Sequence, residues 1–351
     1  MKNNLFYYAT SELSQDAFIC WLMSFALDSS PDPVLKNCAI QLIKLFVPEL
    51  SSVDFTLTQI EHQVALSKKN RLDVLLTVEA VGQVYKIIIE DKTYTSEGDN
   101  QLQRYVDEAT AKFPSCIIRG VYYKTGFQCD LSAAKNAGYT IINRKQLVDF
   151  MRDFATATTN QIFLDYYNYW STYQNETELF QTLPLSQWGY KQVYGFYDYL
   201  KESAYFDDNG LWFEYGYVPN KNNGFYGLWA GSDLYSITIN DKIYELYLQM
   251  ETVTGDVTTS QICLKLSAQE EKPDWEHLRA TRDYLVYTPD WTYKLNEFHF
   301  HKPKRLALGR HMTIGVYDVS LTDFDNFMKA LQLSVQDYNK FLRALHVTFS
   351  T

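Results

Sequence analysis

Two acidic residues and a lysine stand at the ends of two segments that alternate as β-strands. Asp73 lies near the start of the segment 71–78, while Glu90 ends the segment 84–90 and Lys92 follows two residues later. Residues two apart on a strand share a face, and a short turn joins the two segments as a hairpin. The pairing therefore predicts that Asp73 and Glu90 lie side by side, with Lys92 next to them.

This set has the composition of a metal-dependent hydrolytic site. Two carboxylates so close together cannot both stay ionised without a cation, and carboxylate oxygens are ligands that Mg²⁺ prefers. We expect the side-chain ends of Asp73 and Glu90 to converge within one coordination sphere. We also expect at least one acid of the cleft to have a raised pKa when no metal is bound, unless Lys92 compensates.

Strand alternation also assigns faces to the neighbouring residues. It puts Asp73 opposite Leu72, Val74 and Leu76, and it turns Asp91 away from Glu90. An acid in a core strand needs an explanation, because an unpaired buried carboxylate is costly. A functional role for Asp73 supplies one.

The segments that position these residues follow an α/β order. Apolar residues at helical or alternating spacing predict helices over about 11–26 and 33–46, strands over 53–64, 71–78 and 84–90, a helix over 96–112, strands over 116–123 and 139–143, and helices over 145–154 and 161–180. This order predicts an α/β layer sandwich around a mixed sheet.

A second domain is expected beyond the Leu183-Pro184-Leu185 run, because 351 residues suit two domains better than one. The expected boundaries are 1–183 and 184–351. The second domain should contain a helix over about 187–202, aromatic alternating strands with turn signals between them, and a last helix over about 322–345. We expect an α+β fold with an antiparallel sheet.

The charge balance counts against a general attraction to nucleic acid. The chain has 32 basic and 42 acidic residues, a net charge of −10, so no positive field surrounds the whole molecule. One acid-free basic stretch could still grip a phosphate backbone locally. It contains Lys302, Lys304, Arg305 and Arg310. The rival interpretation is a merely solvated loop.

Other features favour a cytoplasmic protein with no membrane association. The five cysteines are scattered without a Cys-x-x-Cys pair, which is typical of reduced, buried thiols and not of a zinc site. No apolar run reaches the ~20 residues of a membrane span, and the N-terminus has no secretory pattern. His299, His301 and His311 could suggest a metal site, but no carboxylate is spaced to join them, so we interpret them as basic or structural residues.

The motifs together resemble a known family. An acid in one strand, Glu-x-Lys in the next and a Gln-x-x-x-Tyr helix afterwards resemble the PD-(D/E)XK nuclease superfamily, specifically its RecB-type members, over about residues 3–180. Those families carry a glutamate on the first core helix, which Glu12 matches. The proline of the family name is absent, since Leu72 precedes Asp73. Asp16 lies one turn from Glu12 and could replace it as the helical ligand.

The resemblance implies a fold, a cofactor and a role for each residue. The fold would be a restriction-endonuclease-like three-layer sandwich, and the cofactor Mg²⁺, with Mn²⁺ able to substitute. Asp73, Glu90 and the backbone carbonyl of Asp91 would bind the metal, with Glu12 in or near that shell. Lys92 would orient or deprotonate the attacking water. The residues expected to contact substrate are Gln101, Tyr105, Arg71, Lys302, Lys304, Arg305 and Arg310.

The sequence thus predicts a Mg²⁺-dependent nuclease, acting on DNA in preference to RNA, with a C-terminal domain for substrate selection, assembly into a homo-oligomer or partner binding. The alternative is a catalytically silent nuclease-like module that acts in interaction or sensing, which the acidic charge would suit. The intact set of two acids and a lysine favours the enzyme.

Overall fold

The computed structural model describes residues 3–27, 32–219, 224–239, 242–252, 260–268, 270, 273–289, 295–317 and 323–349, with the backbone alone described for 234–239 and 345–349. Its chain divides into two compact units, Met1–Asn175 and Glu176–Thr351. This division falls inside a helix, eight residues before the boundary that the Leu-Pro-Leu run suggests. Each unit is described by itself.

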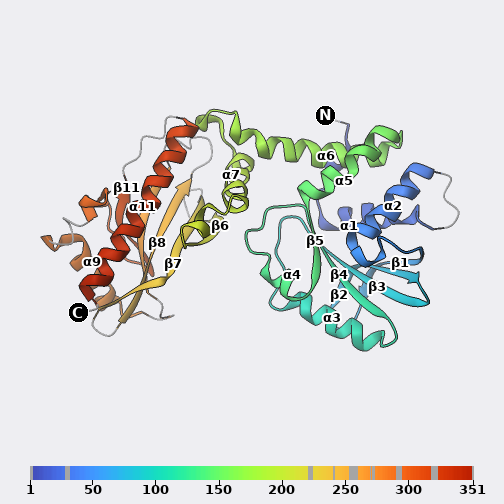
Figure 1. Ribbon diagram of the computed structural model, residues 1–351, viewed down its shortest axis with the longest axis horizontal. Helices are drawn as coiled ribbons and strands as arrows, with labels where there is room; N and C mark the ends of the chain where they lie inside the picture. Colours follow the sequence, from blue (N-terminus) through green and yellow to red (C-terminus); the bar gives the residue numbers. More distant parts are fainter. Residues whose placement is uncertain are drawn as a thin grey trace. The chain divides into compact units, whose positions relative to one another are not determined.

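A five-stranded sheet forms the centre of the first unit (Figure 1). Its spatial order follows the chain order of β1 (Phe55–Ala65), β2 (Arg71–Ala80), β3 (Gln83–Lys92), β4 (Ile117–Lys124) and β5 (Tyr139–Asn143). The first three strands pair antiparallel, whereas β4 and β5 continue the sheet in parallel. The expected mixed sheet is confirmed.

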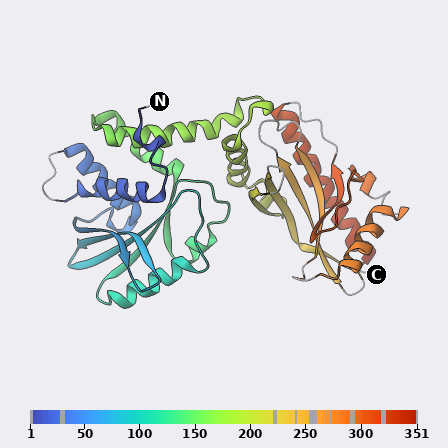
Figure 2. The same cartoon turned by 180° about the vertical axis from the view of Figure 1, so that it is seen from behind.

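Helices cover both faces of this sheet (Figure 2). One face packs against α1 (Glu12–Ser24), α2 (Pro33–Phe46), α5 (Arg144–Ala157) and the first part of α6 (Gln161–Glu178), in one large apolar core. The other face packs against α3 (Gln101–Lys112) and the short α4 (Ser132–Asn136) in two smaller clusters. The unit is therefore the expected three-layer α/β sandwich.

The helix starts follow local capping chemistry. Ser11 caps α1 by accepting a hydrogen bond from the Ser14 amide, and Asp32 caps α2 just before Pro33. The third helix begins later than the expected residue 96. Asn100 has a φ of 50°, which lies outside the right-handed helical region, so α3 starts at Gln101 and the preceding residues form a loop.

One face assignment is wrong. Leu72 does not pack with Val74 and Leu76 but joins Leu75 in the small cluster under α3. Strict alternation fails here beside Gln63 of β1, which has a φ of 53° at the point where the pairing of β1 with β2 skips a residue pair. The strand end that carries Asp73 is therefore locally irregular.

The second unit contains a six-stranded sheet that is antiparallel throughout its described pairings. Its spatial order is β10 (Phe300–His301), β11 (His311–Tyr317), β9 (Gln261–Ala268), β8 (Lys242–Thr252), β7 (Phe225–Ile239) and β6 (Trp212–Val218). The α-helices among its described residues are α7 (Tyr190–Glu202), α8 (Tyr205–Asp208), α9 (Trp275–Tyr287) and α11 (Phe324–Phe349). The expected α+β fold with an antiparallel sheet is confirmed.

Gly126, just after β4, allows a close approach of two chain segments, and this generates a first prediction. A methyl group at this position would overlap the carbonyl group of Thr93, the residue after Lys92. We therefore expect Gly126→Ala to lower the free energy of unfolding by about 1–3 kcal/mol, the usual cost of overpacking. Urea unfolding of the variant measures this decrease.

The matched control is Gly98→Ala. An added methyl group there meets only the Gln101 side chain, at 3.7 Å, which is an ordinary van der Waals contact. This control should unfold at the wild-type urea concentration. Equal midpoints for both variants would contradict the close packing of Gly126 on Thr93.

Candidate metal and catalytic site

The ends of β2 and β3 bring the two predicted acids together. The strand register pairs Val74 with Ile89, and one further step sets Asp73 opposite Glu90. The two carboxyl groups are close enough for the charge of Asp73 to raise the pKa of Glu90. Asp73 also accepts a hydrogen bond at Oδ2 from the Asp91 amide, 3.0 Å away.

Glu90 is buried and is hydrogen-bonded through one of its two carboxyl oxygens. Its side chain is 1% exposed, and Oε1 accepts hydrogen bonds from Lys92 Nζ at 2.6 Å and Gln101 Nε2 at 2.9 Å. Its other oxygen, Oε2, is buried and has no hydrogen-bond partner among the described residues. Glu90 Oε2 is therefore an unsatisfied carboxylate oxygen in the site, as is Asp16 Oδ1.

The Gln-x-x-x-Tyr pair of α3 belongs to this network. Gln101 donates to Glu90 and also to the Tyr105 hydroxyl, 2.7 Å away. Tyr105 itself is buried among Leu75, Ile88 and their neighbours. In the structure this pair holds Glu90 in position.

The first helix offers two acids to the same region, and they have different surroundings. Glu12 Oε1 accepts hydrogen bonds from the Thr93 amide at 3.0 Å and the Thr95 hydroxyl at 2.8 Å. Asp16 lies closer to Asp73, because Gln63 Nε2 donates to both, at 3.2 and 3.3 Å. Of the two, Asp16 is therefore the direct neighbour of the strand acids.

Asp91 faces away from Glu90, as alternation predicts. Its fully buried carboxyl group accepts a hydrogen bond from Gln15 Nε2, and its Oδ2 has no partner within the described chain. The same Gln15 nitrogen contacts the hydroxyls of Thr93 and Thr125 at 3.2 and 3.1 Å. Sequence reasoning missed Gln15 and Gln63, because nothing local marks an amide whose partners lie on other elements.

The buried acids have raised pKa values, which confirms that expectation. Burial, followed by the charge of Asp73, raises the pKa of Glu90 to about 8 even though Lys92 opposes the shift. The same two causes raise the pKa of Asp16 to about 6. Burial lowers the pKa of Lys92, but Glu90 and Asp73 raise it by more, so the net shift is upward.

These residues fit a Mg²⁺ ion that keeps several of its waters. The described part of the chain contains no group of three His, Cys, Asp or Glu side chains close enough to hold a metal between them. Mg²⁺ is usually bound through one or two carboxylates plus water, however. The unpartnered Oε2 of Glu90, beside Asp73, is a suitable oxygen ligand.

The remaining predicted residues lie elsewhere. Arg71 is exposed at the first position of β2. The basic stretch belongs to the second unit, where Lys302, Lys304, Arg305 and Arg310 are all exposed. Lys302 Nζ lies 3.9 Å from the centre of the Tyr287 ring.

The histidines of the second unit have structural contacts. His299 precedes the two-residue strand β10 and lies 2.8 Å from Asp337 Oδ2, through Nδ1. His311 Nδ1 lies 3.1 Å from the Tyr247 hydroxyl. These contacts suit the interpretation of basic or structural residues.

The comparisons with known proteins agree with the motifs. Residues 3–168 match the model of the PD-(D/E)XK nuclease superfamily, which supports the resemblance that the motifs indicate. The α/β sandwich of the first unit is the restriction-endonuclease-like fold that the resemblance implies. Neither the curated proteins nor the solved structures gave a match. No described helix is both long and apolar enough to cross a bilayer.

The raised pKa of Glu90 predicts a pH dependence for the metal-free protein. Between about pH 4.5 and 8 the unfolded chain loses the Glu90 proton while the folded chain keeps it. Stability from this group is therefore full below pH 4.5 and is lost as the pH rises through 8. Urea midpoints of wild type and Glu90→Gln, compared at pH 5, 6.5 and 8 in EDTA, test this.

Glu90→Gln cannot titrate and should flatten the decline between about pH 6 and 8. Asp16, with a pKa of about 6, also makes stability decline as the pH rises, but at lower pH than Glu90 does. The Glu90→Gln variant retains this part of the decline. Glu79→Gln, an exposed acid on the same hairpin, is the control and should keep the wild-type profile. Identical slopes for wild type and Glu90→Gln would contradict a protonated Glu90.

Proposed function

We propose that the chain is a Mg²⁺-dependent nuclease that hydrolyses phosphodiester bonds of nucleic acid, DNA in preference to RNA. One observation carries the proposal. Asp73 and Glu90 meet at the ends of adjacent strands with Lys92 Nζ 2.6 Å from Glu90. The match of residues 3–168 to the model of a nuclease superfamily supports it.

Asp73, Glu90 and the backbone carbonyl of Asp91 would hold the metal, with Mn²⁺ able to replace Mg²⁺. Asp16 or Glu12 would complete the set from α1, and the contact of Asp16 with the Gln63 amide favours Asp16. A bound divalent ion supplies Lewis-acid stabilisation of charge on the phosphate and makes water more acidic. The chain itself supplies the oxygens that fix the ion.

Lys92 has the properties of a hydrogen-bond donor in this site. Its pKa is raised by the two acids, so the ammonium form dominates before metal binds. An ammonium group orients water and stabilises negative charge on the attacked phosphate. This supports the orienting role more than the role of a base in the metal-free state.

Gln101 and Tyr105 would act through Glu90. The Gln101 amide fixes Oε1 of Glu90 by a hydrogen bond and is itself in contact with Tyr105. The free oxygen Oε2 is thereby held in a constant direction, which preorganises the carboxylate for a cation. Arg71, exposed two residues before Asp73, would contact the phosphate backbone.

Removal of Lys92 should separate catalysis from folding. We expect Lys92→Ala to keep the fold and most of the metal affinity, because the carboxylates remain. Cleavage should fall by the ~10²–10⁴-fold that a positioned proton-transfer or hydrogen-bonding group contributes. Assays on single-stranded DNA, duplex DNA and RNA, each with Mg²⁺ and Mn²⁺, measure this decrease.

Lys86→Ala is the matched control. Lys86 lies on the same strand and is 8% exposed, against 9% for Lys92. Its ammonium group donates a hydrogen bond to the Thr77 hydroxyl and not to the acids of the site. The control should cleave like wild type, whereas Asp73→Ala should lose both cleavage and Mg²⁺ binding. If wild type and Lys92→Ala were equally inactive on every substrate, the catalytically silent interaction module would be favoured.

The C-terminal unit would select substrate through its basic stretch. The segment between β10 and β11 carries four exposed basic residues, Lys302, Lys304, Arg305 and Arg310. Exposed cations in one stretch of an acidic chain give a local phosphate contact. An oligomer interface or a protein partner on this unit is the rival role.

Replacement of these four residues by Gln should weaken nucleic-acid binding and flatten its salt dependence, because fewer counterions are released. The slope of log K against log salt should fall in magnitude by roughly 0.9 for each duplex phosphate that the protein no longer neutralises. Fluorescence anisotropy at several salt concentrations measures both quantities.

The matched control also removes four charges from the same unit. This control replaces four other exposed residues of the unit, Lys201, Arg279, Lys329 and Arg343. Like the basic stretch, the set contains two lysines and two arginines. Their replacement by Gln should leave the slope close to wild type. Equal effects of the two quadruple variants would show that only net charge matters and would exclude a specific basic site.

A further inference from the structure

The hairpin that joins β1 to β2 carries a cluster of basic side chains. Its turn has the sequence Leu66-Ser67-Lys68-Lys69-Asn70 and leads into Arg71, the first residue of β2. Lys68, Lys69 and Arg71 are all exposed, and none of the three side chains is in an ion pair with a described residue. The segment 66–71 contains no acid. These three residues are called the hairpin cations below.

The turn that carries the two lysines has an ordered backbone. The amides of Leu66 and Ser67 both donate to the Asn70 carbonyl, at 3.0 and 3.3 Å. The Ser67 hydroxyl oxygen accepts hydrogen bonds from the amides of Lys69 and Asn70, at 3.4 and 3.3 Å, an arrangement that serine favours in turns. The lysines therefore extend from a defined support.

The same hairpin is hydrogen-bonded to α3. Asn70 Nδ2 donates to Glu108 Oε1 at 2.5 Å, and Lys112 Nζ donates to the Ala65 carbonyl at 2.8 Å. The first residue of α3 donates to Glu90. One helix therefore holds both the hairpin and a carboxylate of the candidate metal site, so the hairpin cations and the acids share a common support.

The hairpin cations lie at the end of the sheet that carries the acids. Arg71 precedes Asp73 by two residues, which is ~7 Å along a strand. The acids of the site and the net charge of −10 repel a polyanion, so a nucleic-acid backbone needs cations close to the metal. Lysine and arginine side chains that neutralise phosphates release counterions, which favours binding. The hairpin supplies three such side chains beside the site.

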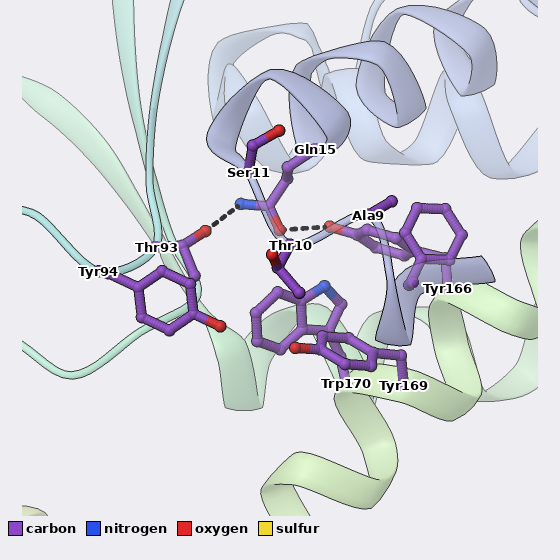
Figure 3. Close-up of a pocket in the computed structure, with 10 residues that line it drawn as sticks. Ala9, Thr10, Ser11, Gln15, Thr93, Tyr94, Tyr166, Tyr169 and Trp170 are labelled. Carbon is purple, nitrogen blue, oxygen red and sulfur yellow. Dashed lines mark hydrogen bonds between the residues drawn. The ribbon is translucent and has the colours of Figure 1, made fainter. Parts of the chain in front are cut away.

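The side of β3 that faces α1 is closed to a nucleic-acid strand. Gln15 contacts the Thr93 hydroxyl there and accepts a hydrogen bond from the Tyr166 hydroxyl (Figure 3). The space that these residues line together with Trp170 is about 20 Å³, enough for one water molecule. A phosphate backbone has no room on this side, whereas the exposed hairpin offers a surface that can receive it.

We propose that the hairpin cations bind the phosphate backbone of the strand to be cleaved, within a few nucleotides of the scissile phosphate. The inference rests on the proposed nuclease function and adds the class of substrate. Lys68 and Lys69 act as point charges, and the Arg71 guanidinium can bond two phosphate oxygens at once. Contacts to phosphate read no base, so the hairpin accepts any sequence. They also lie outside the scissile bond, so polynucleotides are favoured over dinucleotides.

Binding without cleavage tests the hairpin independently of catalysis. Full-length protein in EDTA is titrated into fluorescein-labelled duplex DNA at several salt concentrations, with anisotropy as the readout. Lys68→Gln, Lys69→Gln and Arg71→Gln are combined in one triple variant, and circular dichroism checks that it is folded. At about 0.1 M salt its binding should be roughly 8-fold weaker for one lost phosphate contact and ~500-fold weaker for three, because each contact adds ~0.9 to the salt slope. The slope itself should fall by the same amount per contact.

A matched triple variant removes the same charges elsewhere in the first unit. Lys135, Lys145 and Arg152 are exposed on α4 and α5, which contact β5, at the opposite edge of the sheet from β1. Their replacement by Gln should leave the affinity and the salt slope close to wild type. Equal effects of the two triple variants would show that only net charge matters and would overturn the proposal.

Cleavage in Mg²⁺ then gives the register of the backbone. One uncharged methylphosphonate linkage in a labelled strand should reduce wild-type cutting at bonds a fixed number of nucleotides away. The hairpin variant should cut more weakly but show no such reduction, because the contact is already absent. The same reduction in both proteins would overturn the proposal.

The two experiments separate the hairpin from the nuclease function. Wild-type affinity and salt slope in the hairpin variant, together with cleavage that depends on Lys92, would reject only the hairpin contact. A wild type that cleaves no substrate, yet binds through the hairpin cations, would reject the catalytic function and retain the hairpin as a phosphate-binding surface.

Discussion

The fold buries the Glu90 carboxyl group and gives hydrogen bonds to only one of its oxygens. Oε1 accepts from Lys92 and Gln101, while Oε2 has no partner among the described residues. An unpaired buried carboxylate is costly, and the neighbouring Asp73 adds like-charge repulsion. The raised pKa of Glu90 expresses this cost, and the rest of the site is arranged around it.

The apolar residues of β3 supply the stability that offsets the cost of burying Glu90. Ile87, Ile88 and Ile89 are fully buried and face the two helical layers in alternation. Because cores are densely packed, the chain cannot relax Glu90 towards solvent without moving this platform. The apolar part of β3 therefore supplies stability, and the acidic end of the same strand, at Glu90, does not. This division between scaffold and site is usual in enzymes.

The sequence predicted those features that depend on short-range periodicity. Alternation along β3 placed Glu90 and Lys92 on one face and Asp91 on the other, and Ser11 marked the start of α1. It failed for Leu72, because Gln63 on the partner strand takes a positive φ that no pattern in β2 reveals. It also could not find Gln15, whose partner Asp91 is 76 residues away. Side chains that act through distant partners leave no local signal.

The hydrogen bonds around the Gln15 side chain depend on one another. The amide nitrogen has two hydrogens, yet it contacts three oxygens, on Asp91, Thr93 and Thr125. The network closes because the Thr93 and Thr125 hydroxyls lie 3.1 Å apart and one can donate to the other. Burial raises the pKa of Asp91 well above its usual value, so a proton on this carboxyl would supply a further donor. A shift of Gln15 would therefore reorder protons on the strand that carries Glu90 and Lys92, which makes the position of this one amide a constraint on the whole site.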